Sequence, residues 1–484
     1  MASLALLPLV ASGPAQAANP VCTVTSSDDS GDGSLRACVT VTNATGGDIV
    51  FQEGLPGTIL LASGLLLSND VAILGPGADM LTIQAAPPGF RVFDVTSGVT
   101  ATISGLTITG GGGGYGGAIL NEGTLTVTGS TLSGNSVVNG GGAIANYGAL
   151  TVTGSTLTGN TVEGGGGGAI TSWGTMTVTN STIAGNSADV GGGGILASSD
   201  LTVTNSTIAG NFGGGSIGGG IGISGTPTVV LRNALVAGNT AAYGNDLYGP
   251  VDVASSFNNL VGAQDSGGNV DGALVDGVNG NQVGVTEPGL GPLADNGGPT
   301  QTMTLLPGSP AIDAASATYA PQTDQRGVAR DRAPDIGAFE AGPQPDLLVS
   351  RLAGSGYVGD DVYNTTGAGQ TKRLSARRTQ TRTFYVRVVN DGAVRTRFAL
   401  RGSAPAAGSR VRYFKGDVEI TTPMRSKAGW PVTLRAGAAK TIEMRITVRR
   451  SAAFGSRMPG TVTATWPSDR SRADLVRGIV TVVR

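Results

Sequence analysis

The chain has 484 residues, a formal net charge of −2 and 81 glycines, and it contains no histidine. A chain of this length accommodates two or three domains. The lack of histidine excludes Ser-His-Asp triads, histidine general bases and histidine metal ligands.

Residues 1–17 have the pattern of a secretory signal peptide. A short apolar core begins at Leu4, and Ala15–Ala17 has the small residues of a cleavage site. A buried N-terminal strand is the alternative for this segment. No later segment is apolar enough to cross a membrane as a helix. We therefore expect a secreted or cell-surface protein without a nucleic-acid partner.

Residues 18–54 are predicted to cap the first coil of the fold that follows, as a strand, an acidic loop and a short helix. Cys22 and Cys38 are expected to form a disulfide that closes a loop of about 16 residues, with free thiols as the alternative. The acidic loop Asp28–Asp32 is a weak calcium candidate. Its spacing does not match an EF-hand, so we favour a solvated loop and predict no cofactor.

A pattern of about 25 residues recurs five times between Leu125 and Asn239. Each clear copy opens with an alternation such as Leu-Thr-Val-Thr, which predicts a strand, and a second short strand follows. A third strand is predicted in the glycine-flanked segments Gly116–Ile119, Gly141–Ile144 and Gly167–Ile170. Three strands and three turns per copy predict one coil of a parallel β-helix, which buries its apolar side chains only by stacking.

One asparagine occupies the same place in every copy. Asparagine tolerates the left-handed conformation of a sharp turn, and stacked side-chain amides bond along a column. We predict a structural ladder of Asn135, Asn160, Asn186, Asn211 and Asn239. Less regular coils from residue 55 and looser ones to residue 289 complete the predicted β-helix.

Two motifs resemble known families. Asp32-Gly-Ser-Leu-Arg36 resembles the N-terminal motif of CSLREA-type secreted bacterial β-helix proteins, with Ala37 in place of the usual acidic residue. Residues 106–240 resemble the repeats of polymorphic outer-membrane proteins, which act as surface adhesins. These resemblances imply a right-handed, pectin-lyase-like β-helix exposed at the cell surface.

Residues 290–341 closely resemble the choice-of-anchor Q region of secreted bacterial β-helices. The resemblance rests on the run from Leu290 to Asp313, on Asp324-Gln-Arg-Gly327 and on Asp335-Ile-Gly-Ala-Phe-Glu340. Its charged residues predict ion pairs that fix a plug of loops over the last coil. These residues are Asp313, Asp324, Arg326, Arg330 and Asp335. A carboxylate active site is the alternative.

The chain changes character after a predicted linker at residues 342–345. Residues 1–345 hold about six arginines, no lysine and about 24 acidic groups, whereas residues 346–484 hold about 25 basic and nine acidic groups. Seven or eight alternating strands in residues 346–484 predict an immunoglobulin-like β-sandwich. Its positive charge offers a possible contact for anionic polymers.

Catalytic candidates are few. A polysaccharide lyase needs a cation for the uronate carboxyl and a base, yet no basic residue lies between Arg91 and Arg232. A glycoside hydrolase needs two carboxylates a few ångströms apart. Asp246 and Asp252 are the best available pair, and both are weak candidates.

The alternating threonines predict a flat outward lattice. It comprises Thr126, Thr128, Thr151, Thr153, Thr177, Thr179, Thr202 and Thr204. Such lattices resemble those of ice-binding β-solenoids, although threonine is also an ordinary solvent-facing strand residue.

We therefore predict an all-β chain, with a right-handed parallel β-helix followed by an immunoglobulin-like sandwich. Its expected role is adhesion or surface-polysaccharide binding without catalysis, and its expected partner is a surface glycan or another cell-surface component. A polysaccharide lyase or glycoside hydrolase is the first alternative, and an ice-binding protein is the second.

Overall fold

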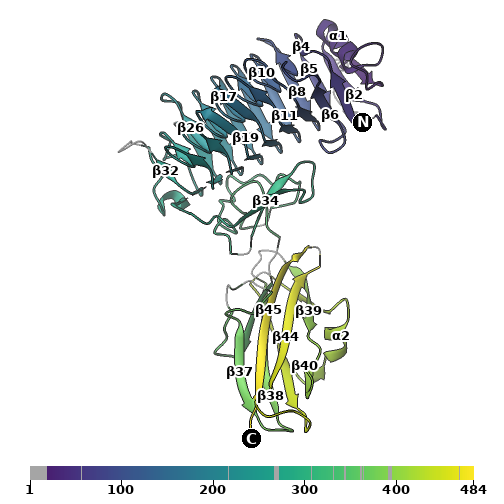
Figure 1. Cartoon of the computed structure of the whole chain (residues 1–484), viewed down its shortest axis with the longest axis vertical. Helices are drawn as coiled ribbons and strands as arrows, with labels where there is room; N and C mark the ends of the chain where they lie inside the picture. The colour runs from purple at the N-terminus through teal and green to yellow at the C-terminus, as the bar shows by residue number, and fades with distance from the viewer. Residues whose placement is uncertain are drawn as a thin grey trace, which may run out of the picture.

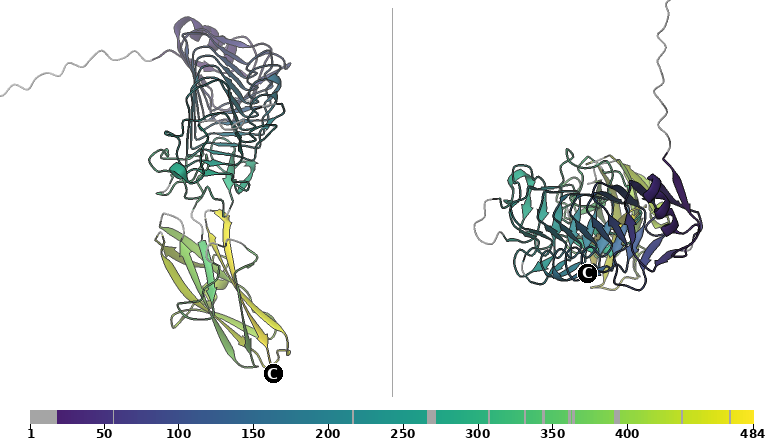
Figure 2. Two further views of the ribbon diagram at one scale, coloured as in Figure 1. Left: turned by 90° about the vertical axis from the view of Figure 1, so that its left-hand side faces the viewer. Right: turned by 90° about the horizontal axis from the view of Figure 1, so that it is seen from above.

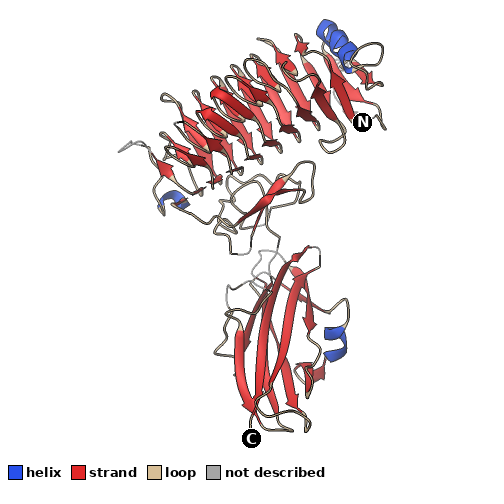
Figure 3. Cartoon of the chain, in the orientation of Figure 1, coloured by secondary structure: helices blue, strands red, loops and turns tan. Residues whose placement is uncertain are grey.

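The computed structural model describes residues 19–55, 57–215, 217–265, 272–306, 308–330, 332–342, 345–359, 362, 365–390, 395–435, 437–467 and 469–484. The predicted signal peptide, residues 1–17, lies outside the described residues. The chain is all-β and consists of a parallel β-solenoid and a C-terminal antiparallel sandwich that follows residue 342 (Figures 1 and 3).

Four parallel sheets run along the solenoid, and their strands stack coil upon coil (Figure 2). Sheet A comprises β1 Val21–Val24, β2 Gly47–Phe51, β5 Val71–Leu74, β8 Thr100–Ser104, β11 Thr124–Thr128, β15 Ala149–Thr153, β19 Thr175–Thr179, β23 Leu201–Thr204 and β27 Val229–Arg232. Sheet B comprises β3 Thr58–Leu61, β6 Thr82–Ala85, β9 Thr107–Thr109, β12 Thr131–Ser133, β16 Thr156–Thr158, β20 Thr182–Ala184, β24 Thr207–Ala209, β28 Leu235–Ala237, β31 Leu260–Val261 and β33 Gln282–Val283.

The other two sheets close each coil. Sheet C comprises β4 Leu65–Leu67, β7 Phe93–Val95, β10 Ile119–Asn121, β14 Ile144–Asn146, β18 Ile170–Ser172, β22 Ile195–Ala197, β26 Ile221–Ile223, β30 Leu247–Tyr248 and β32 Gln264–Asp265. Sheet D comprises β13 Ser136–Val137, β17 Thr161–Gly165, β21 Ser187–Val190, β25 Phe212–Gly213 and β29 Thr240–Ala241. A short 3-10 helix, η1 Val278–Gly280, precedes β33.

Strand alternation decides which side chains form the solenoid core. Leu125 pairs in register with Leu150, and Val127 pairs with Val152. All four are buried, whereas the threonines between them face outward. The stacked coils thereby bury a continuous apolar column that one coil alone cannot bury.

The predicted third strand of each coil was placed too early. The observed strands begin at Ile119, Ile144 and Ile170, where the predicted segments end, and the preceding glycines form a tight turn. A Cβ at Gly141 would lie 1.8 Å from the carbonyl oxygen of Ile144, so the chain doubles back too closely for a side chain. The glycines are therefore needed for this turn and do not belong to the strand.

The N-terminal end of the core is covered by helix α1, Leu35–Thr45. Ser34 caps this helix by accepting a hydrogen bond from the Ala37 amide at 3.1 Å. The predicted disulfide is confirmed, because Cys22 on β1 and Cys38 on α1 are bonded. None of the helices in the described residues is long and apolar enough to cross a bilayer.

The C-terminal domain packs two five-stranded sheets against each other, so it has more strands than predicted. One sheet comprises β36 Pro345–Ser350, β38 Thr381–Asn390, β43 Ala439–Val448, β40 Ser409–Lys415 and β41 Val418–Glu419. The other comprises β37 Thr371–Ala376, β45 Asp469–Val482, β44 Arg457–Trp466, β39 Thr396–Gly402 and β42 Trp430–Leu434. A short helix, α2 Thr421–Arg425, lies between β41 and β42. Buried side chains such as Phe384, Phe398 and Tyr413 form the core between the sheets.

Candidate functional site

Residues 290–341 lie along the side of the solenoid, and we call this segment the brace. It carries the antiparallel pair β34 Leu290–Ala294 and β35 Thr302–Leu305. Its contacts with sheet B extend from the Gly154 carbonyl, which accepts from Thr300, to Leu235 and Leu260, which share an apolar cluster with it. The prediction that this segment forms a plug over the last coil is therefore wrong about its position. The segment packs against the outside of several coils.

A column of left-handed asparagines holds the brace. Asn180, Asn205, Asn233 and Asn258 have positive φ at the turn from sheet A to sheet B. The Nδ2 atoms of Asn180 and Asn205 donate to the carbonyl oxygens of Thr323 and Asp335, at 2.7 and 3.2 Å. The corresponding turns of the two preceding coils have glycine, at Gly129 and Gly154, and the brace bonds the Gly154 coil through its backbone carbonyl and Thr156.

The replacement of glycine by asparagine in these turns is thus a sequence signal for the coils whose turn side chains bond the brace. Sequence reasoning overlooked it, because the ladder asparagines drew attention to a different turn. Glycine supplies the same left-handed backbone but has no side chain to bond a neighbouring segment.

Gln325 joins the brace to the threonines of sheet B. Its side chain is buried, and its Oε1 accepts from the Thr182 hydroxyl at 2.6 Å. Its Nε2 donates to the hydroxyls of Thr156 and Thr300, both at 2.9 Å. A glutamine matches this set because its amide offers both an acceptor and two donors.

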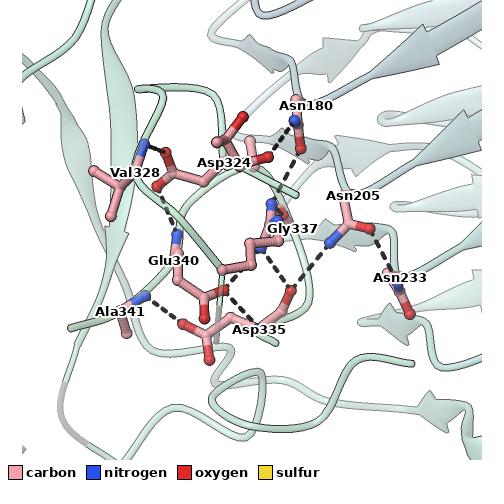
Figure 4. Close-up of polar contacts among 12 residues, drawn as sticks. Asn180, Asn205, Asn233, Asp324, Val328, Asp335, Gly337, Glu340 and Ala341 are labelled. Atoms are coloured by element: carbon pink, nitrogen blue, oxygen red, sulfur yellow. Dashed lines mark hydrogen bonds and ion pairs between the residues drawn. The ribbon is translucent and has the colours of Figure 1, made fainter. Parts of the chain in front are cut away.

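The charged residues of the brace form two linked groups (Figure 4). Asp324 pairs with Arg326 at 2.6 Å and accepts from the backbone amides of Val328 and Glu340. Arg330 pairs with Glu340 at 3.0 Å, and both side chains are almost fully buried. Glu340 was not among the predicted ion-pair residues, yet it is the partner of Arg330.

The Asp335 carboxylate forms hydrogen bonds with backbone amides of the brace. The carboxylate of Asp335 accepts from the backbone amides of Asp313, at 2.8 Å, and of Ala341. Burial raises the pKa of Asp335 well above its ordinary value, and the nearby Glu340 charge adds to the shift. Asp313 has a left-handed backbone, with φ of 56°, so it turns the chain at this point.

The raised pKa of Asp335 predicts a pH dependence for the brace. The folded state holds a proton that the unfolded chain releases above its ordinary pKa of 3.8. This contribution to the free energy of unfolding is therefore complete below that value and is lost as pH rises through the folded pKa. We expect protection factors of the amides of residues 332–341 to fall across this interval in hydrogen exchange. Asp335→Asn, which cannot ionise, should weaken that dependence, and an unchanged pH profile would contradict it.

The predicted asparagines form an interior column, in which each Nδ2 donates to the next side-chain oxygen. The distances are 2.9 Å from Asn135 to Asn160, 2.8 Å from Asn160 to Asn186, 2.9 Å from Asn186 to Asn211 and 2.8 Å from Asn211 to Asn239. A second, shorter column, which the sequence reading missed, runs from Asn121 through Asn146 to Ser172.

The structure places the two catalytic candidates in different surroundings. Asp246 is buried and forms the last rung of the asparagine column, where it accepts from the Nδ2 of Asn239 at 2.8 Å and from the Ala263 amide at 2.6 Å. An ionised carboxylate only accepts, which suits the end of a column of donors. Asp252 accepts from the amides of Ala254 and Ser255, and the hydrogen bonds from Ser255 lower its pKa. Asp246 thus links its coil to the next one, whereas Asp252 stabilises its own turn.

Two other predicted features keep their place in the fold. The threonines of the lattice pair in register on the outer face of sheet A, and the next coil replaces the last pair with Val230 and Arg232. In the acidic loop Asp28–Asp32, Asp29 pairs with Arg36 at 2.7 Å and accepts from the Ala62 amide at 3.0 Å. The described part of the chain holds no cluster of three or more metal-ligating side chains.

A depression lies beside the end of the brace that faces the N-terminal coils. This cleft has a volume of about 480 Å³, and sheet B forms its floor. The floor carries the hydroxyls of Thr107, Thr131, Ser133 and Thr158, and one wall is the loop with Asp79. The opposite wall is formed by Asp295 and residues 298–301 of the brace.

The cleft presents exposed carboxylates and hydroxyls. Thr107 donates to the Ala78 carbonyl at 2.6 Å. The hydroxyls of Thr131, Ser133 and Thr158 make no hydrogen bond to another residue of the described chain. The carboxylates of Asp79 and Asp295 are exposed, and no arginine or lysine lines the cleft. Such a surface suits a neutral ligand with many hydroxyl groups.

An aromatic column is another exposed feature of the solenoid. Tyr147 and Trp173 occupy the same turn of adjacent coils and stack at 4.5 Å between ring centres. Tyr115 approaches Trp173 edge-on at 6.1 Å. Stacked rings across neighbouring coils stabilise the turns that carry them. All three rings remain partly exposed, at 39–47% of their surface.

Comparison with known proteins supports the fold alone. Residues 92–262 match the family model for a right-handed β-helix region. No curated protein matches the chain. A family 123 glycoside hydrolase from Clostridium perfringens is 8% identical over 24% of this chain and 23% of its own, with a TM-score of 0.18. The chain thus spans less than a quarter of that enzyme.

Two smaller proteins give comparable likenesses. The FixG-related protein from Vibrio parahaemolyticus is 9% identical, covers 29% of this chain and 96% of its own, and has a TM-score of 0.18. The N-terminal domain of PorA is 11% identical over 28% and 96%, with a TM-score of 0.19. These scores carry no argument about fold or function. The family match and the stacked coils together show that residues 92–262 form a right-handed β-helix region.

Proposed function

We propose that the β-helix binds a neutral glycan chain in the cleft beside the brace, without catalysis, and that the protein acts at the cell surface or after secretion. The observation that carries this proposal is the row of unpaired hydroxyls of Thr131, Ser133 and Thr158 between two exposed carboxylates. Carboxylates and hydroxyls at fixed spacing match the hydroxyl groups of a sugar chain.

The contacts of the brace support this choice of ligand. On the covered coils, the Thr156 hydroxyl donates to the Gln301 carbonyl at 2.6 Å, and the Thr207 hydroxyl accepts from the Ala338 amide at 3.0 Å. The hydroxyls of sheet B therefore bind polar groups that lie across them. Beyond the brace the same sheet continues uncovered, so a sugar chain meets the same type of donor and acceptor.

The proposal is tested by blocking the cleft in the full chain. Ser133→Tyr places a ring on the cleft floor, and we expect affinity for a neutral hexasaccharide, chosen from a panel by calorimetry, to fall about tenfold or more. Thr128→Tyr is the matched control, because Thr128 faces outward in the same coil on sheet A. Equal effects of the two substitutions, or no binding of any neutral glycan, would contradict the proposal.

Hydrolysis is the second candidate function, because Asp79 and Asp295 line the same cleft. The same glycans should be assayed for new reducing ends. We expect none with the full chain, and Asp79→Asn and Asp295→Asn should only weaken binding. Reducing ends that disappear in either variant would replace the binding proposal with a glycoside hydrolase.

A further inference from the structure

A second hollow lies on the sandwich, over the middle of β39. Its volume is about 320 Å³. Ala399 lies at its floor, and Pro431 on β42 and Thr465 on β44 are its neighbours on the two sides. The hollow exists because Ala399 and Gly429 are small, while the residues around them carry longer side chains.

Two arginines stand on either side of this floor. Residues two apart on a strand point to the same face, so Arg397, Ala399 and Arg401 share the outer face of β39. Both arginines line the hollow. Four residues of strand separate them by about 13 Å at the backbone, and their long side chains can both lean over Ala399.

These arginines lack the acidic partners that their counterparts have. Neither belongs to any ion pair of the described residues. One Nη of Arg401 donates to the Lys427 carbonyl, but its Nε is buried and has no partner among the described groups. The two guanidinium groups therefore have no carboxylate partner among the described residues, and their remaining Nη donors are the groups that an anion in the hollow would meet.

The outer face of the opposite sheet provides the contrast. There Arg445 pairs with Glu443 at 2.7 Å, and Arg412 lies 3.6 Å from Glu419. The basic character of the domain is therefore partly neutralised on that sheet. At the hollow the positive charge of the two arginines is not neutralised by an ion pair of the described residues. The surrounding excess of basic residues also raises the local concentration of anions.

We propose that this hollow binds the anionic group of an acidic sugar, either a carboxylate or a sulfate ester. Guanidinium groups hold such groups through short charge-assisted hydrogen bonds. The rings of Pro431 and Pro467 and the Thr465 side chain offer walls for a sugar ring. The volume lies near the lower end of ligand sites, about 300–1,000 Å³, so one sugar unit fits. This inference does not depend on the cleft of the β-helix.

The test uses the full chain with a hexasaccharide of galacturonate, a sulfated hexasaccharide and a neutral hexasaccharide, measured by calorimetry. Arg397→Gln removes one charge, and Ala399→Leu fills the floor without changing charge. We expect each to weaken binding of one acidic ligand by about tenfold or more. Arg410→Gln is the matched control, since Arg410 is exposed on the opposite sheet, and it should change affinity less than about twofold.

The outcomes separate a built site from general attraction. Similar losses for Arg397→Gln and Arg410→Gln, with Ala399→Leu unchanged, would overturn the proposal in favour of diffuse charge. Failure of both acidic ligands to bind at millimolar concentration would also overturn it. Thermal unfolding checks each variant, and Thr465→Leu narrows the same hollow if Ala399→Leu does not fold. The acidic hexasaccharide whose affinity falls in these variants shows whether the hollow binds a carboxylate or a sulfate ester.

Discussion

Asn186→Ala should lower the free energy of unfolding of the β-helix by about 4 kcal/mol, because it removes a central rung of the buried amide column. The Asn186 side chain accepts from the amide and Nδ2 of Asn160, at 3.0 and 2.8 Å, and donates to the Leu157 carbonyl at 3.0 Å. Each group left buried without a partner costs about 1–3 kcal/mol. An alanine restores none of these bonds.

The measurement is chemical denaturation in a Trp430→Phe/Trp466→Phe background, in which Trp173 alone reports on the solenoid. Asn139→Ala is the control, because Asn139 is exposed in the same coil as Asn135, and it should cost under about 0.5 kcal/mol. A loss for Asn186→Ala no larger than that of the control would show that the column adds nothing to stability.

Arg330→Met should destabilise the brace by about 3–5 kcal/mol, because it removes the cation that pairs with the buried Glu340 carboxylate. Arg330 also donates to the carbonyl oxygens of Asp335 and Gly337 and to the Asn180 side chain, so its loss releases the brace from the asparagine column. The double variant Arg330→Met/Glu340→Met removes both charges and should recover most of the loss.

The same denaturation assay, combined with hydrogen exchange of residues 308–341, measures this effect. Arg91→Met is the control, since its pair with Asp94 lies in the solenoid, is partly exposed and should contribute less than about 1 kcal/mol. If the double variant is as unstable as Arg330→Met, the cost comes from lost packing and backbone hydrogen bonds, and the uncompensated charge is not its cause.

The repeats made the solenoid predictable, because periodicity and alternation are local properties. The period of about 25 residues and the Leu-Thr-Val-Thr alternation indicated stacked coils and the correct buried face. The glycine segments led to a wrong strand position. The glycines before Ile119 resemble the start of a strand in the sequence, but in the structure they form a turn. The disulfide followed from the expected export of the chain and from the cysteine count.

The brace and the cleft were harder to predict, because both depend on contacts between distant segments. Thr156 and Gln301 touch although 145 residues separate them. The charges of residues 313–340 indicated a fixed loop region but not the surface against which it packs. The burial of Asp246 was not predicted for the same reason, since its position is set by Asn239 and Ala263. The hydroxyls of the cleft could not be recognised from the sequence, because threonine is common throughout the repeats.

The asparagine column at the sheet A to sheet B turn has a consequence for how this protein can change in length. Repeat proteins gain and lose whole units by recombination between similar copies. A unit inserted between Asn180 and Asn258 would shift the asparagines against a brace of fixed length and break its bonds. A unit inserted before Gly129 would lie outside the brace and leave those bonds intact. Growth and shrinkage of this β-helix are therefore confined to its N-terminal side.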